Sequence, residues 1–193
     1  MALPDLDDPA EELTATGRVI LGMIALGRQT GYDIKALVDK TTRYFWAASY
    51  GQIYPELRSL EERGLVRGRP EPTGGRARTV YELTEAGQTA LHGWLASGAE
   101  PSYELRDEGM LKLFFSDSLP EERIANIRAM RERQERKLAQ LRALEPHAAE
   151  GAGEQRTSGP YLTLQLGIAS TECFIEWCAA TERRLGAETQ KGS

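Results

Sequence analysis

Cationic and hydrogen-bonding side chains gather in two short stretches of the chain. The first, SYGQIYPELR (49–58), combines hydroxyl, amide and guanidinium groups in one short amphipathic segment. The second, TGGRAR (73–78), places Arg76 and Arg78 after two glycines, so that a flexible backbone presents positive charge. Such groups bind phosphate oxygens and form hydrogen bonds with the edges of bases. Both stretches therefore indicate a polyanionic partner that also carries bases.

The distribution of charge fits such a partner. The whole chain has a net charge of −5, which alone argues against nucleic acid. Residues 18–80, however, contain eleven Lys and Arg against six Asp and Glu, which makes this block +5 within an acidic chain. Localised phosphate binding requires a basic block of this kind, although a solvated helix face has the same composition.

Three short helices must position these residues. Apolar side chains recur at helical spacing in RVILGMIALGRQT (18–30) and GYDIKALVDKTTRYF (31–45). A third apolar stripe consists of Ile53, Leu57 and Leu60, and Gly64 follows it as a helix-terminating glycine would. The pattern predicts three helices within about fifty residues.

The start of the third helix has two interpretations. Ser49 followed by Gln52 is a capping box, which predicts a helix from Ser49 with Pro55 in its second turn. Pro55 would then crowd the carbonyl of Gly51, the residue type that bends at the smallest cost. Alternatively, the helix begins at Pro55 as its first residue, and the preceding segment is a loop.

A β-hairpin is predicted after the third helix. LVRGR (65–69) and RTVYELT (78–84) resemble strands, and the intervening PEPTGGRA (70–77) is rich in turn-forming residues. Three helices followed by a basic hairpin constitute a winged helix-turn-helix. In this motif the third helix enters the major groove of DNA, and the wing lies along the backbone or minor groove.

The chain resembles the PadR-like family of transcriptional regulators. Five segments carry the resemblance: LGMIALGRQTGYDI, SYGQIYPELRSLEERGLV, GGRARTVYELTEAG, ELRDEGMLKLFF and LQLGIASTECFIEW. It extends from about Arg18 to Leu185, with an unusually long acidic N-terminal arm and a long glycine-rich linker at 145–160 as departures. The resemblance implies a C-terminal dimerisation region and, for some family members, aromatic or amphipathic effectors bound near the dimer interface.

The C-terminal half indicates self-association without reference to the family. The segment 120–146 has an interrupted apolar stripe and is too polar to be buried alone, whereas 161–185 is apolar around most of its circumference. Since a small domain has few places to bury such a helix, packing against a second subunit is expected. A symmetric dimer would present two recognition helices to a palindromic operator in double-stranded DNA.

The predicted fold is mainly α-helical with a small β-hairpin wing. It comprises an acidic, flexible N-terminal arm (1–17) and a winged helix-turn-helix DNA-binding domain (18–97). A helical dimerisation domain (98–185) and a flexible tail (186–193) complete the chain.

The candidate site residues fall into two groups. Those expected to contact DNA are Tyr32, Lys35, Ser49, Tyr50, Gln52, Tyr54, Arg58, Arg76 and Arg78. The weaker candidates for an effector site are Trp46, Trp94 and Trp177, for which packing in the core or dimer interface is the competing explanation.

The predicted function is that of a sequence-specific, DNA-binding regulator in the cytoplasm, a homodimeric repressor released by a small-molecule effector. The alternative is a winged-helix module that binds proteins and not DNA. We expect no enzyme, because no glycine-rich phosphate loop or nucleophile elbow is present. We expect no cofactor, metal or membrane contact: His92 and His147 lack ligand-spaced partners, and no apolar run is long enough to span a bilayer.

Overall fold

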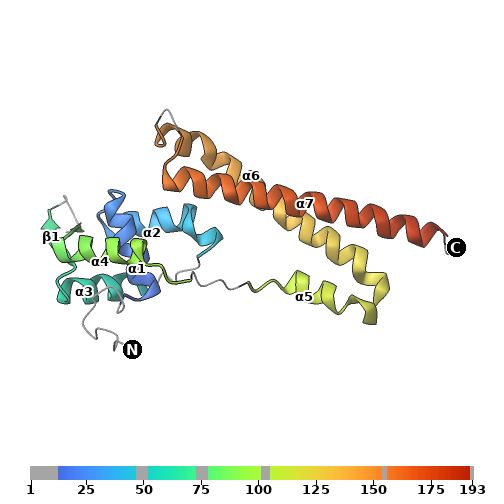
Figure 1. The fold of residues 1–193 in the computed structure, drawn as a ribbon, viewed down its shortest axis with the longest axis horizontal. Helices are drawn as coiled ribbons and strands as arrows, with labels where there is room; N and C mark the ends of the chain where they lie inside the picture. The colour runs from blue at the N-terminus through green and yellow to red at the C-terminus, as the bar shows by residue number, and fades with distance from the viewer. Residues whose placement is uncertain (1–12, 47–51, 73–77, 101–104, 154–155, 192–193) are drawn as a thin grey trace. The chain divides into compact units, whose positions relative to one another are not determined.

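Residues 13–46, 52–72, 78–100, 105–153 and 156–191 are described in a computed structural model of the 193-residue chain (Figure 1). The chain divides into two compact units, residues 1–101 and 102–193. The elements of the first unit are α1 (Ala15–Ala25), α2 (Gly31–Lys40), η1 (Thr42–Tyr44), α3 (Ile53–Glu62), β1 (Val66–Glu71), β2 (Arg78–Leu83) and α4 (Glu85–Ala96). The second contains α5 (Glu108–Phe114), η3 (Ser116–Ser118), η4 (Pro120–Glu122), α6 (Arg123–Glu150) and α7 (Gly159–Lys191). The predicted mainly helical fold with a two-stranded wing is confirmed, whereas the domain limits at residues 17, 97 and 185 stay predictions.

Threonine side chains begin three helices of the first unit. Thr14, Thr30 and Thr84 precede α1, α2 and α4, and each hydroxyl oxygen accepts a hydrogen bond from the backbone N–H three residues later, at 2.9–3.1 Å. Each cap satisfies an N–H group that the helix itself leaves without a partner. The chain is thereby turned into each helix at a defined residue.

The core of the first unit is made by one face of each helix and the base of the hairpin. Ile53, Leu57 and Leu60 of α3 are almost fully buried, as their spacing predicted. Helix α1 starts at Ala15, three residues before the predicted first residue of the domain, Arg18, and Leu13, which the sequence assigned to the arm, is buried in this core. The other members of the core are Ile20, Leu21, Met23, Ile24, Ile34, Val38, Leu65, Val66, Ala90 and Leu91.

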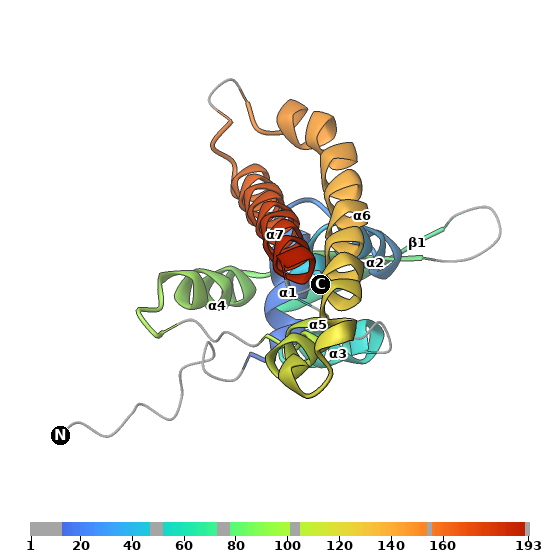
Figure 2. The same cartoon turned by 90° about the vertical axis from the view of Figure 1, so that its right-hand side faces the viewer.

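Strands β1 and β2 pair antiparallel and form the wing, the name used below for residues 66–71 and 78–83. Val66 is opposite Leu83, Gly68 opposite Tyr81, and Glu71 opposite Arg78. Figure 2 shows the two strands extending away from the helices. The predicted hairpin is confirmed, and it packs on the core through Val66 of β1 and through Tyr81 and Leu83 of β2.

Helices α6 and α7 run antiparallel and side by side in the second unit (Figures 1 and 2). Their shared core contains Ile127, Met130 and Cys178. The Glu182 carboxylate accepts a hydrogen bond from Nε of Arg131 at 2.8 Å and lies 3.7 Å from Arg128. Burial raises the pKa of the Cys178 thiol. These contacts tie the end of α7 to the first half of α6.

The linker predicted at 145–160 is too long at both ends. Helix α6 continues to Glu150 with Pro146 inside it, and α7 begins at Gly159. Pro146 lacks the N–H group that would bond to the Arg142 carbonyl, but one missing bond does not end a helix of 28 residues. The connection between the two long helices is therefore short.

Helix α7 leaves large apolar side chains uncovered within one chain. Leu162, Leu166 and Trp177 are about half exposed or more. Of the helices in the described part of the chain, none combines the length and apolar character needed to cross a membrane.

Candidate nucleic-acid interface

Helix α3 presents a polar face opposite its buried stripe. Pro55 and Arg58 lie about 180° and 130° around the helix from that stripe, and both are exposed. Glu62, two turns after Pro55, continues this face. Pro55 adds little bulk, so the backbone of the first turn can approach a partner closely while Arg58 extends beyond it.

Both predicted starts of α3 differ from the structure. The helix begins at Ile53, with Gln52 as the residue before its first turn and no side-chain cap. Pro55 is therefore the third helical residue, neither the first nor a member of the second turn. At this position its missing N–H removes no bond, because the first N–H groups of a helix have no intrahelical acceptor. Ser49 and Tyr50, two of the predicted contact residues, lie outside the described residues.

Tyr54 joins α3 to the beginning of α2. Its ring packs on Gly31, where a side-chain Cβ would come within 2.7 Å of a Tyr54 ring carbon. Tyr54 is nevertheless 56% exposed, and its neighbour across this contact, Tyr32, is 74% exposed. Lys35 lies one turn further along α2 and is exposed too. The structure thus places the first turn of α2, which carries Tyr32, against Tyr54 of α3.

The opposite flank of α3 is held by the first turn of α1. The hydroxyl of Thr16 donates a hydrogen bond to Oε1 of Gln52 at 3.4 Å. The hydroxyl of Thr14 donates to Oε1 of Glu56 at 2.7 Å, which keeps this carboxylate near the positive end of α1. Because this bond uses the carbonyl oxygen of Gln52, the amide N–H groups are the part of the side chain that could donate to a phosphate or a base.

The wing carries a cluster of charged side chains on one face, called here the arginine face. By the alternation of strands this face consists of Arg67, Arg69, Glu71, Arg78, Val80 and Glu82. Arg78 forms an ion pair with Glu71 at 2.5 Å. Glu82 accepts a hydrogen bond from Arg69 and lies 3.7 Å from Arg67. The hydrogen bond from Arg69 is the main reason that the pKa of the Glu82 carboxyl is lowered.

Sequence reasoning missed Arg67 and Arg69. The prediction used Arg76 and Arg78 at the turn, and Arg76 lies outside the described residues. The alternation Arg67-Gly68-Arg69 in a strand would have indicated that both arginines share a face. The carboxylate partners could not be found in this way, because the strand register decides them.

Hydrogen bonds connect the base of the wing to α3 and to the turn before α2. The N–H of Gly68 donates to Oε1 of Glu61 at 3.0 Å, and the N–H of Tyr81 donates to the Gln29 carbonyl at 2.6 Å. The Tyr81 ring also lies against Gly68, opposite it in the ladder. Burial, and secondly the charge of Glu61, raises the pKa of the Tyr81 hydroxyl. The wing is thus oriented relative to the exposed face of α3.

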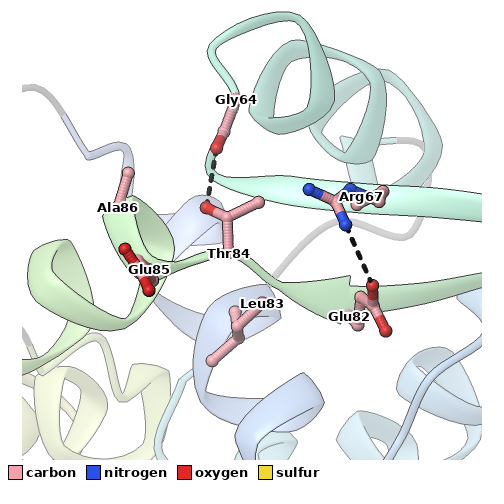
Figure 3. Close-up of a pocket in the computed structure, with 7 residues that line it drawn as sticks. All are labelled: Gly64, Arg67, Glu82, Leu83, Thr84, Glu85 and Ala86. Atoms are coloured by element: carbon pink, nitrogen blue, oxygen red, sulfur yellow. Dashed lines mark hydrogen bonds and ion pairs between the residues drawn. The ribbon is translucent and has the colours of Figure 1, made fainter.

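A shallow depression lies where the wing meets α4 (Figure 3). The Thr84 hydroxyl donates to the Gly64 carbonyl at 2.7 Å across this joint, and Arg67 faces Glu82 on its other side (Figure 3). The remaining lining residues are Leu83, Glu85 and Ala86. Charged walls and an internal hydrogen bond make this depression a joint between elements rather than a site for an apolar ligand.

The three candidate tryptophans have different surroundings. Trp46 is half-buried after η1. Trp94 of α4 lies 5.8 Å below the guanidinium of Arg18, a cation–π contact. Trp177 belongs to the second unit, where its ring is tilted against Phe174 at 6.4 Å. Among the contacts that the structure describes for these three rings, only that of Trp94 involves a cationic side chain.

Comparisons with known proteins agree with this arrangement. Residues 20–93 match the model of the transcriptional regulator PadR-like family, and residues 105–186 match a model named virulence activator alpha C-term. The negative transcriptional regulator PadR of Bacillus subtilis is 28% identical over 164 residues, covering 82% of this chain and 90% of that protein.

Two crystal structures of that Bacillus subtilis protein are similar in fold. Its complex with operator DNA has a TM-score of 0.78 at 27% identity, over 87% of this chain and 96% of that one. Its complex with p-coumaric acid has a TM-score of 0.71 at 28% identity, over 88% of this chain and 97% of that one. The similarity includes both units of the chain.

Proposed function

The chain belongs to the PadR-like family of transcriptional regulators, and from this premise we propose that it is a homodimeric repressor that reads DNA with α3 and the wing. The observation that carries the proposal is the position of Arg58 and Tyr54, exposed on α3, beside a wing with three arginines on one face. Tyr54, Arg58 and the amide of Gln52 face the major groove, together with Ser49 and Tyr50. Tyr32 and Lys35 bind phosphates from the start of α2; Arg78 of the wing and Arg76, which precedes it in the sequence, bind them as well.

Dimerisation is supported by the apolar side chains that one chain leaves uncovered in the second unit. On and after α5, Met110, Leu111, Phe114, Phe115 and Leu119 are 43–79% exposed. Leu162 and Leu166 of α7 are exposed as well, and large exposed apolar side chains that gather in one region are typical of an association surface. A second copy covers this area and supplies the second recognition helix for a palindromic operator. Because its target is chromosomal DNA, we place the protein in the cytoplasm.

Repression is the direction supported by the similar protein named a negative transcriptional regulator. A winged-helix module that binds only proteins would not need the arginines of the wing. Enzymatic activity is not a property of this family of regulators. DNA binding is therefore the activity to test first.

Loss of Arg76 and Arg78 is expected to reduce the salt dependence of DNA binding. Each phosphate contact contributes about −0.9 to the slope of log K against log salt, so Arg76→Ala/Arg78→Ala should flatten the slope by up to about two units. The measurement is fluorescence anisotropy with DNA from upstream of the protein's own gene at several salt concentrations. Arg142→Ala, whose side chain pairs with Glu172 in the second unit, is the control. An unchanged slope in the double variant would remove Arg76 and Arg78 from the interface.

The effector is proposed to be a small aromatic acid. The Bacillus subtilis relative has been crystallised with p-coumaric acid, which has an aromatic ring and a carboxylate. In this chain the guanidinium of Arg18 lies over the Trp94 ring, and its Nε is buried with no hydrogen-bond partner among the described residues. The ring of such a ligand could stack on Trp94, and its carboxylate could pair with Arg18 and accept the hydrogen bond that Nε lacks.

Arg18→Gln is therefore expected to weaken effector-induced release without weakening DNA binding. Losing a charge-assisted hydrogen bond to a carboxylate costs about 1.5–3 kcal/mol, so release should require roughly ten times more p-coumaric acid or more. The measurement is a titration of p-coumaric acid into the protein–DNA complex. Arg28→Gln, the same change just after α1, is the control. If both variants leave DNA at the p-coumaric acid concentration that releases the wild-type protein, the Arg18–Trp94 site is excluded.

A further inference from the structure

The arginine face of the wing is almost balanced in charge within the described residues. It carries the guanidiniums of Arg67, Arg69 and Arg78 and the carboxylates of Glu71 and Glu82. All three arginine side chains are more than half exposed while they are paired. A DNA backbone can therefore reach these guanidiniums, but each of them already contacts a carboxylate of the wing.

Glu82 contacts more of these arginines than Glu71 does. It accepts the hydrogen bond of Arg69 and lies 3.7 Å from Arg67, so one carboxylate holds two of the three guanidiniums. The strand register places Glu82 directly opposite Arg67 and diagonally from Arg69. A phosphate that binds either arginine must replace this carboxylate or accept its repulsion.

The cost of this exchange differs between two kinds of complex. On its operator, α3 contacts the bases and brings the wing to a fixed place on the backbone, so base contacts offset the exchange. On random DNA no base contacts hold the wing, and binding comes almost entirely from phosphate contacts. A carboxylate that competes for the arginines therefore weakens binding to random DNA more than binding to the operator.

We propose that Glu82, assisted by Glu71, is a specificity-determining residue that keeps the guanidiniums of the wing off random DNA until α3 is seated on its operator. This inference rests on the proposed function, because it requires the wing to contact phosphates. It adds that the acidic residues of the wing act in recognition, by lowering affinity for the wrong DNA.

The test is the Glu82→Gln variant of the full-length protein, measured by fluorescence anisotropy on operator and on random duplexes. Glutamine keeps the size of the side chain and removes its charge. Affinity for random DNA should rise about three- to tenfold, with a salt slope steeper by about one unit, while affinity for the operator rises less. The ratio of operator to random affinity should therefore fall. An unchanged ratio overturns the inference.

Two further variants separate the release of arginines from a general loss of negative charge. Glu85→Gln removes a carboxylate from the same depression, and the structure describes no ion pair for Glu85. It should change binding to random DNA less than twofold. In an Arg67→Ala/Arg69→Ala background, Glu82→Gln should have almost no effect, because the arginines that it frees are absent. Equal effects of Glu82→Gln and Glu85→Gln, or a full effect in that background, contradict the inference.

The same experiment distinguishes failure of the inference from failure of the proposed function. If the wild-type protein binds no DNA, or if the Arg67→Ala/Arg69→Ala variant binds DNA as well as the wild type does, the wing does not contact phosphates. Both the proposed wing contact and the inference then fail. Wild-type binding that weakens with Arg67→Ala/Arg69→Ala but does not respond to Glu82→Gln overturns the inference alone. Thermal unfolding of each variant establishes that its fold is unchanged.

Discussion

Replacing Gly87 with alanine is expected to destabilise the first unit by about 3 kcal/mol or more. Gly87 is in the first turn of α4, where that helix packs on the turn between α3 and β1, and an added Cβ would overlap the carbonyl oxygen of Leu65. That carbonyl also accepts a hydrogen bond from the N–H of Thr84 at 3.2 Å, and it shares the Thr84 hydroxyl proton, at 3.1 Å, with the Gly64 carbonyl. The joint therefore cannot widen without losing both bonds.

Two effects of this substitution have opposite signs. Alanine favours a helix over glycine by up to about 1 kcal/mol, whereas overlap with a backbone atom forces the two elements apart. The overlap should dominate, because a backbone carbonyl cannot rotate away as a flexible side chain does. For a unit of this size, the melting temperature should fall by more than about 10 °C, as measured by calorimetry or circular dichroism.

Gly22→Ala is the matched control for Gly87→Ala. Gly22 lies inside α1, and no atom is within 4 Å of the position of an added Cβ. Without overlap, the helix preference of alanine should raise stability by about 0.5–1 kcal/mol. A Gly87→Ala protein that melts at the wild-type temperature would contradict the close packing of α4 on Leu65.

Arg58→Ala is expected to cause the largest loss of operator binding among single substitutions on the described part of α3. An arginine that contacts a guanine edge contributes about 1–3 kcal/mol of discrimination, so operator affinity should fall roughly 10- to 100-fold. Binding to random DNA should fall much less, because only one positive charge is lost. Competition of operator against random DNA measures both effects in the same protein.

Lys40→Ala removes the same charge from the same unit and is the control. Lys40 ends α2, nine residues after Gly31, which places it about 14 Å along the helix from the contact with Tyr54. Operator binding should change little in this variant. If Arg58→Ala lowers operator and random binding equally, Arg58 contacts a phosphate and does not read a base.

The order of elements was predictable because it depends on local patterns. Apolar spacing predicted α1, α2 and the buried face of α3, and turn residues between two β-rich segments predicted the wing. The first residue of α3 was not predictable from the cap alone. Pro55 is acceptable at the first and at the third helical position, because neither position has an intrahelical acceptor for its N–H, and the structure has it at the third.

The partners within the candidate site could not be predicted, because they join residues far apart in the sequence. Glu61 accepts from Gly68 only because α3 and β1 meet at that angle, and the strand register brings Glu82 to Arg67 and Arg69. The cation–π contact of Arg18 with Trp94 similarly requires α1 to pack on α4. Residue types indicated a site for phosphates and bases, and the tertiary structure shows which of its charges are already paired.

The central claim is that this protein, as a dimer, reads a palindromic DNA sequence. A selection of binding sites from random-sequence duplexes with the full-length protein tests it most directly. The proposed function predicts an enriched inverted repeat whose half-site centres are about 10–10.5 base pairs apart, or a multiple of that distance. Folded protein that enriches no sequence would contradict the claim and would favour a winged-helix domain that binds other proteins.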